Sequence, residues 1–181
     1  LCSRRKNSKG ADFIFDSNMK VSDEIFEGAT HVISCIPPLL SGQDPVIKQL
    51  KTQLLNSKKL KWVGYLSTTG VYGDTKGEWV NEDASPNPQQ ERSIRRFSCE
   101  KQWLETKLPV QILRLPGIYG PGRSAFESLL AGTVKLVDKP GQVFSRVHVD
   151  DIAGAVLFLI NLYSKGKDPK IVNIADNLPT N

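Results

Sequence analysis

The sequence has few of the residues from which metal centres and disulfide frameworks are built. It holds three cysteines, Cys2, Cys35 and Cys99, and two histidines, His31 and His148, among 181 residues. An odd number of widely spaced cysteines argues against a disulfide framework and favours a reducing compartment, which we expect to be the cytoplasm. Because no Cys-x-x-Cys pair accompanies the histidines, we predict no metal site.

Long apolar runs and clustered charge are missing as well. The longest strongly apolar stretch, 152–163, has about a dozen residues, whereas a helix needs about 20 to cross a bilayer. Lysine and arginine outnumber aspartate and glutamate by 24 to 19, which gives a net charge of +5, but the basic residues are spread along the chain. The sequence therefore predicts neither a membrane nor a nucleic-acid partner, and it leaves the oligomeric state open.

What is present is the composition of a globular domain, with 39% hydrophobic and 24% charged residues. Runs typical of strands alternate with amphipathic helical segments. We expect strands at 12–15, 31–36, 61–66, 110–115 and 171–174, and helices at 44–57 and 90–106. This alternation predicts parallel strands with helices on both sheet faces, which is the doubly wound, Rossmann-like α/β fold.

The organisation of the chain suggests one domain with a small excursion. Residues 1–181 are predicted to form a single domain that begins within a strand, so we expect it to be truncated at its N-terminus. Residues 132–150 are predicted to be an insertion on the substrate side, with an antiparallel turn at 139–141. After it, Asp150 and Asp151 are expected to cap the N-terminus of the next helix.

Three strand ends carry small, stiff or hydroxyl-bearing residues, in the segments SCIPP (34–38), STTGVYG (67–73) and RLPGIYGPG (114–122). Ligands of doubly wound folds bind outside the carboxyl ends of the strands. Glycine and proline let the backbone approach a flat ligand, while serine and threonine supply hydrogen bonds without bulk. The segments therefore predict a ligand site, with tight strand-to-helix turns as the alternative interpretation.

These segments, with FSRVHVDDIAGAV (144–156) and NIAD (173–176), occur in the order and approximate spacing of the extended short-chain dehydrogenase/reductase superfamily. The chain resembles that superfamily over nearly its whole length. SCIPP, GQDPV (42–46) and YLSTTGVYGDTKGEWVNE (65–82) are similar to its atypical NAD-dependent epimerase/dehydratase-like branch. The resemblance implies a Rossmann fold that binds NAD(H) or NADP(H), although the family's first glycine-rich turn is not matched here. The turn at 117–122 is a poor substitute, because its spacing differs and Pro121 has no N–H to donate.

The resemblance also implies where a dinucleotide would lie. Arg4 and Arg5 resemble the end of the second strand, where arginine meets the 2′-phosphate of NADP, so NADP is expected, with NAD and an exposed basic turn as the alternatives. Ile36 and Pro37 are expected on the adenosine side. The remaining predicted cofactor contacts are Ser67, Pro116, Gly117 and Ile118, the last three against the nicotinamide.

Catalysis in the family rests on a Ser/Thr hydroxyl and a Y-x-x-x-K pair. Thr68 matches the hydroxyl, but the two positions of the pair hold Arg92 and Arg96. A guanidinium stays protonated, so the arginines can bind an anionic or carbonyl group but cannot accept a proton; exposed surface charges are the alternative interpretation. Tyr72 and Tyr119 are the candidates for a displaced acid, and Tyr72 is kept among the predicted catalytic residues.

Three residues are predicted to contact substrate: Thr69, Arg146 and His148. The functional hypothesis is an NAD(P)-dependent oxidoreductase or epimerase-like enzyme that acts on a small polar substrate, either sugar-like or carboxylated. The alternative hypothesis is a non-catalytic NADP-binding sensor or scaffold, because the usual proton relay is absent.

Overall fold

The computed structural model describes residues 2–3, 13–16, 21, 23–133 and 142–180. The strands are β1 (Cys2–Ser3), β2 (Phe13–Ile14), β3 (His31–Ser34), β4 (Trp62–Thr68), β5 (Val110–Leu115), β6 (Gly117–Tyr119), β7 (Arg146–His148) and β8 (Ile171–Asn173). The α-helices are α1 (Pro45–Asn56), α2 (Glu91–Leu104), α3 (Ala125–Leu130) and α4 (Val149–Ser164), and the 3-10 helices are η1 (Asp23–Phe26) and η2 (Thr69–Tyr72).

The centre of the fold is a parallel sheet with the strand order β3-β4-β5-β8. Two short parallel pairs, β1 with β2 and β6 with β7, stand apart from it. The predicted strand 110–115 has the observed bounds, whereas β4 runs two residues beyond the predicted 61–66 and β3 ends at Ser34 instead of residue 36. Helices α1 and α2 occupy the two segments in which helices were predicted.

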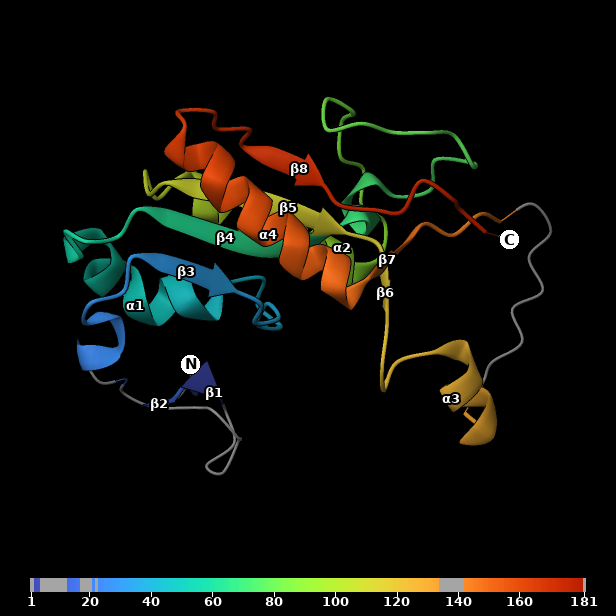
Figure 1. Cartoon of the computed structure of the whole chain (residues 1–181), viewed down its shortest axis with the longest axis horizontal. Helices are drawn as coiled ribbons and strands as arrows, with labels where there is room; N and C mark the ends of the chain where they lie inside the picture. The colour runs from blue at the N-terminus through green and yellow to red at the C-terminus, as the bar shows by residue number, and fades with distance from the viewer. Residues whose placement is uncertain (1, 4–12, 17–20, 22, 134–141, 181) are drawn as a thin grey trace.

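The sheet has a hydrophobic core on each face. One core joins α1 and α2 to the sheet through residues such as Leu54, Trp103 and Ile112. The other joins α4 to the opposite face through residues such as Leu113 and Val156. Figure 1 shows α4 crossing in front of β4 and β5, with α2 mostly behind them. Helices on both faces of a parallel sheet confirm the doubly wound α/β class.

Helix α1 begins where its sequence supplies a cap. The Oδ1 atom of Asp44 accepts hydrogen bonds from the backbone N–H groups of Val46 (2.9 Å) and Ile47 (3.0 Å), and Pro45 occupies the first helical turn. Both features satisfy or remove N–H groups that have no partner within the helix. The start of α1 is therefore fixed directly after the loop that follows β3.

The start of α4 differs from the prediction. His148 is the N-cap, and its Nδ1 atom accepts from the backbone N–H of Asp150 at 3.3 Å. Asp150 and Asp151 lie in the first turn instead of at the cap. There their negative charges still favour the helix, because the positive end of the helix dipole lies at the N-terminus. The prediction that these aspartates form the cap was thus wrong by two to three positions.

The predicted excursion at 132–150 is described only in part, because its turn at 139–141 lies outside the described residues. In the described part, β7 pairs with β6 in parallel, and Phe144 forms an antiparallel bridge with Thr180. Across the described ranges, no helix has the length and apolarity that crossing a membrane requires.

Candidate functional site at the carboxyl edge of the sheet

The predicted ligand site lies where β3, β4 and β5 end. Ser34 pairs with Tyr65, and Thr68 pairs with Leu115, so the loops after all three strands leave the same edge of the sheet. The predicted adenosine-side contacts, Ile36 and Pro37, follow β3. The predicted nicotinamide contacts at 116–118 follow β5 directly. The fold therefore gathers these segments at one edge.

A buried ion pair lies beneath this edge, between β5 and α2. The guanidinium of Arg114 donates to the carboxylate of Glu100 through Nε (3.1 Å) and Nη2 (2.7 Å), and both side chains are at most 2% exposed. The Ser67 hydroxyl donates to Oε1 of the same carboxylate. Burial lowers the pKa of the Arg114 guanidinium, but the hydrogen bonds and electrostatic attraction of Glu100 and Tyr72 together outweigh burial, so the pKa is raised. Ser67, predicted to bind cofactor, thus uses its hydroxyl proton inside the protein.

Thr68 is oriented by the turn that follows it. Its Oγ1 atom accepts from the backbone N–H of Gly70 at 3.1 Å, as the N-cap of η2. Gly70 leaves room for α2, because a Cβ there would lie 2.9 Å from Oγ of the buried Ser93. Thr69 begins η2 and is half-buried. Since Oγ1 of Thr68 is an acceptor within the turn, its O–H remains available to donate to a ligand.

Tyr72 is the last residue of η2 and is held on two sides. Its ring covers the guanidinium of Arg114, with 4.8 Å between Cζ and the ring centroid. Its hydroxyl donates to Oδ1 of Asn173 at the end of β8, at 2.9 Å. Oε1 of Glu82 in turn accepts from the backbone N–H of Asn173 at 2.6 Å. The side chain of Tyr72 is therefore fixed by β5 and β8 together.

Arg92 and Arg96, predicted to stand at the positions of the family's Tyr and Lys, differ in their surroundings. Arg96 donates through Nη1 to the backbone carbonyl of Ile36 (3.1 Å) and to the hydroxyl of Tyr65 (2.9 Å). Burial raises the pKa of Tyr65, so this phenol stays protonated. Arg92, one turn earlier on α2, is exposed and donates through Nε to Gln90 at 3.0 Å. Arg96 thus ties α2 to the loop after β3, while Arg92 lies at the surface.

Two of the three predicted substrate residues, Arg146 and His148, lie on the short pair of strands beyond the sheet edge. Gly117 pairs with Arg146, and Tyr119 pairs with His148, with the two rings edge to face at 5.1 Å. The hydroxyl of Tyr119 donates to Oδ2 of Asp176 at 3.2 Å, and this hydrogen bond raises the pKa of the phenol. The segments that follow β5 and β8 therefore meet beside β7.

The turn at 117–122 has its donors occupied, which gives a further reason against a role in holding pyrophosphate. The backbone N–H groups of Gly122 (3.0 Å) and Ser124 (2.9 Å) donate to the carboxylate of Glu127. Glu127 and Ser124 form a capping box at the start of α3. Within the turn itself, the N–H groups of Gly117 and Gly120 donate to the carbonyls of Ser145 and Arg123, both at 3.2 Å. The N–H groups of all three turn glycines are therefore already occupied.

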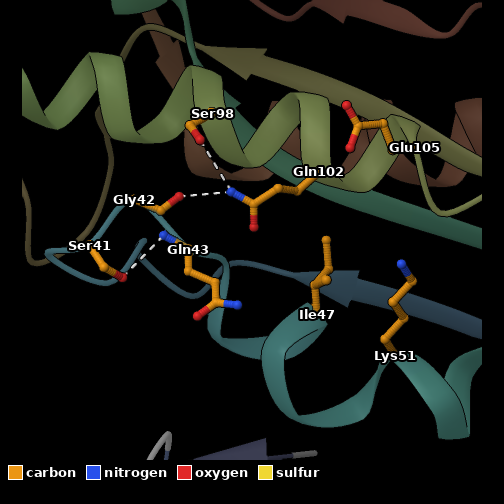
Figure 2. A pocket seen from close by; sticks show the side chains of 8 residues that line it. All are labelled: Ser41, Gly42, Gln43, Ile47, Lys51, Ser98, Gln102 and Glu105. Carbon is orange, nitrogen blue, oxygen red and sulfur yellow. Dashed lines mark hydrogen bonds between the residues drawn. The ribbon is translucent and has the colours of Figure 1, made fainter.

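A separate cleft of about 550 Å³ lies between α1 and α2. Figure 2 shows Gln102 reaching across one end of it, where its Nε2 atom donates to the carbonyl of Gly42 (2.8 Å) and to Ser98 (3.2 Å). Lys51 and Glu105 lie toward the other end. None of the predicted site residues lines this cleft.

The residues at the sheet edge fit part of a dinucleotide. The Oγ atom of Ser34 is buried at the end of β3 and has no hydrogen-bond partner among the described residues, so a polar group at this edge would satisfy it. Gly117 is exposed at the end of β5 and keeps the backbone accessible to a flat ring. Arg4 and Arg5, predicted to meet the 2′-phosphate, lie outside the described residues.

No role is predicted from the sequence for Glu100, whose carboxylate binds Ser67 and Arg114. Arg114 was quoted within a motif, and its place in the apolar run VQILRL was the available signal, because a charge in a buried strand needs a partner. Asn173 and Asp176 were quoted in NIAD without a role. The roles predicted for the site residues remain predictions.

Comparisons with known proteins agree with this architecture. Residues 5–175 match the NAD dependent epimerase/dehydratase family. Protein YeeZ of Escherichia coli strain K12 is 32% identical over 139 residues, which are 73% of this chain and 48% of that protein. This chain thus spans about half the length of the curated relatives it matches.

Solved structures show the same fold. A functionally unknown conserved protein from Silicibacter pomeroyi DSS has a TM-score of 0.76 at 39% identity, over 86% of this chain and 54% of that chain. A UDP-glucuronic acid 4-epimerase from Bacillus cereus, solved in complex with NAD, has a TM-score of 0.68 at 22% identity, over 92% of this chain and 60% of that chain. With nearly its whole length matched, this chain belongs to the NAD dependent epimerase/dehydratase family.

Proposed function

We propose that the protein is an NAD(P)-dependent oxidoreductase or epimerase-like enzyme that acts on a small polar substrate. The dinucleotide would lie along the carboxyl edge of the sheet, with its adenosine near Ile36 and Pro37 and its nicotinamide near 116–118. When bound there, a nicotinamide supplies or accepts a hydride. The family and the NAD-bound neighbour support the class of cofactor.

The observation that carries this proposal is the geometry of Thr68. Its oxygen accepts from the N–H of Gly70, so its proton is free for a ligand at the sheet edge. A hydroxyl that donates to a substrate carbonyl stabilises negative charge on that oxygen as the carbonyl is reduced. The hydroxyl of Ser67 cannot take this role without leaving Glu100.

The arginines indicate the polarity of the substrate. Arg92 is exposed and permanently charged, so it suits a carboxylate or another anionic group, either on a sugar-like or on a carboxylated substrate. Arg146 and His148, beyond the sheet edge, would meet the distal part of that substrate. Thr69 is the remaining proposed substrate contact, and Tyr72 would form a wall beside it.

We further propose that NADP is preferred, with Arg4 and Arg5 on its 2′-phosphate. The partner is a small molecule; the basic residues, dispersed along the sequence, support no nucleic-acid role. The free thiols of Cys35 and Cys99 suit a reducing, cytoplasmic environment.

The first experiment is calorimetric titration of NADPH and NADH into the protein. Binding of at least one is expected, and binding of neither overturns the proposal. Arg4→Ala should weaken the binding of NADPH more than that of NADH. An equal loss of affinity for both dinucleotides would exclude a contact between Arg4 and the 2′-phosphate.

The second experiment follows NADPH oxidation with a panel of keto sugars and oxo acids. Thr68→Val should lower kcat by about 100-fold or more, as expected for a lost transition-state donor. Thr68→Ser is the matched control, because it keeps the hydroxyl. Equal rates for the Val and Ser variants would count against a catalytic hydroxyl.

A second candidate function is a non-catalytic dinucleotide-binding sensor or scaffold. It is favoured by Arg96, whose Nη1 binds Ile36 and Tyr65 at the position where the family places its lysine. Tight dinucleotide binding without turnover on any member of the panel would support this function over the first.

A further inference from the structure

We propose that Glu100 and Arg114 are positioning residues that hold Thr68 and the β4–η2 turn in place from both sides. This inference rests on the proposed function, in which the nicotinamide lies near 116–118 and thus beside Thr68, because Thr68 pairs with Leu115. Neither side chain is offered as a contact of cofactor or substrate, because each is almost fully buried.

The first contact of the ion pair is with Ser67, the residue before Thr68. Glu100 accepts the hydroxyl proton of Ser67, the penultimate residue of β4. Because Arg114 binds both carboxylate oxygens, the carboxylate has a fixed orientation. The end of β4 is thereby tied to α2 one residue before Thr68.

The second contact of the ion pair is with Tyr72, in the turn after Thr68. The guanidinium of Arg114 lies under the ring of Tyr72, whose hydroxyl is held by Asn173. Tyr72 closes η2, the same turn in which the N–H of Gly70 binds Oγ1 of Thr68. Movement of Tyr72 would therefore move the group that orients the Thr68 hydroxyl.

The sheet also contains a buried hydrogen bond between two side chains that lies away from this edge and can serve as a control. Gln111 lies on β5, three residues before Arg114, and accepts a hydrogen bond from Nε1 of the buried Trp62 at 2.7 Å. Like the ion pair, this hydrogen bond is buried, but it joins β4 to β5, whereas the ion pair joins β5 to α2. Loss of the Gln111 hydrogen bond should destabilise the fold without moving the β4–η2 turn.

The test compares binding of NADH and of AMP to the protein and to three variants, each at a temperature at which circular dichroism shows it folded. Glu100→Gln removes the carboxylate charge that binds Ser67 and that holds Arg114 under the ring of Tyr72. Ser67→Ala removes only the hydrogen bond from Ser67 to Glu100 and leaves the ion pair intact. This variant keeps the test usable if Glu100→Gln does not fold. Gln111→Leu is the control for a loss of stability alone.

We expect Glu100→Gln or Ser67→Ala to lower the affinity for NADH about tenfold. The affinity for AMP should stay within about twofold of that of the unaltered protein, because AMP lacks the nicotinamide half. Gln111→Leu should leave both ligands within about twofold, even though its melting temperature falls. Parallel weakening of NADH and AMP in the Ser67 or Glu100 variant, or unchanged NADH affinity in Ser67→Ala and every folded Glu100 variant, overturns the positioning role alone. Failure of the unaltered protein to bind NADH or NADPH instead overturns the proposed function, and this inference with it.

Discussion

Replacement of Asp44 tests how the fold fixes the start of α1. Asp44 is fully buried, and its Oδ1 atom accepts from the backbone N–H groups of Val46 and Ile47. Asp44→Ala leaves both donors without that acceptor, which should cost about 1–2 kcal/mol of unfolding free energy. For a chain of this size the melting temperature should then fall by about 2–8 °C. Asp44→Asn keeps an oxygen acceptor and should lose less than about half as much.

The contribution of Asp44 to stability should depend on pH in the opposite direction to that of a carboxyl group whose pKa is lowered by folding. Burial raises the pKa of Asp44 above its ordinary value of 3.8, although hydrogen bonds from Ile47 and Val46 oppose the shift. The folded protein therefore binds this proton more readily than the unfolded chain does. The resulting stability is fully present below pH 3.8 and is lost as the pH rises through the folded-state pKa.

The Asn variant isolates this effect, because its side chain does not titrate. The unfolding free energy of the unaltered protein, relative to Asp44→Asn, should increase as the pH falls from about 7 toward 4. Urea unfolding followed by circular dichroism at several pH values measures this difference, and most other carboxyl groups cancel from it. A difference that does not vary with pH, or an Asn variant as unstable as the Ala variant, would refute the reasoning.

Two further predictions concern packing and thiol reactivity. Gly64→Ala should cost about 1–3 kcal/mol in urea unfolding, because a Cβ there would lie 2.3 Å from the Trp62 ring; Gly154→Ala on α4, where nothing lies within 4 Å, is the control and should not destabilise. Burial raises the pKa of the Cys99 thiol to about 11, so iodoacetamide at pH 8 should label the exposed Cys35 well before Cys99. Peptide mass spectrometry measures this order, and equal labelling of the two cysteines would contradict it.

The sequence predicted the fold better than the site, for physical reasons. Strand and helix patterns are local, so the segments that became β5, α1 and α2 could be recognised from the spacing of their apolar residues. Partner choice is not local. Helical spacing placed Arg92 and Arg96 on one face, but the docking of α2 on the sheet decided that Arg96 would meet Tyr65.

The cap of α4 shows the same limit on a smaller scale. Aspartate is a stronger N-cap signal than histidine, so local propensity pointed to Asp150. The parallel pairing of β7 with β6 instead continues through His148, and the helix can begin only after that residue. The helix begins directly after this paired residue, two residues earlier than an Asp150 cap would give, and the aspartates fall in its first turn.

The contacts of α2 change in character along its length, and this change separates stability from ligand binding. Toward its C-terminal end, Trp103 packs into an apolar core with Val63 and Ile112. Toward the carboxyl edge of the sheet, Glu100 and Arg96 replace apolar contacts with hydrogen bonds to β4, β5 and the loop after β3. Burying charge there gains little net stability, whereas removing one partner leaves an uncompensated charge. The apolar end therefore holds the helix on the sheet, and the polar end fixes the geometry of the strand ends where a ligand would bind.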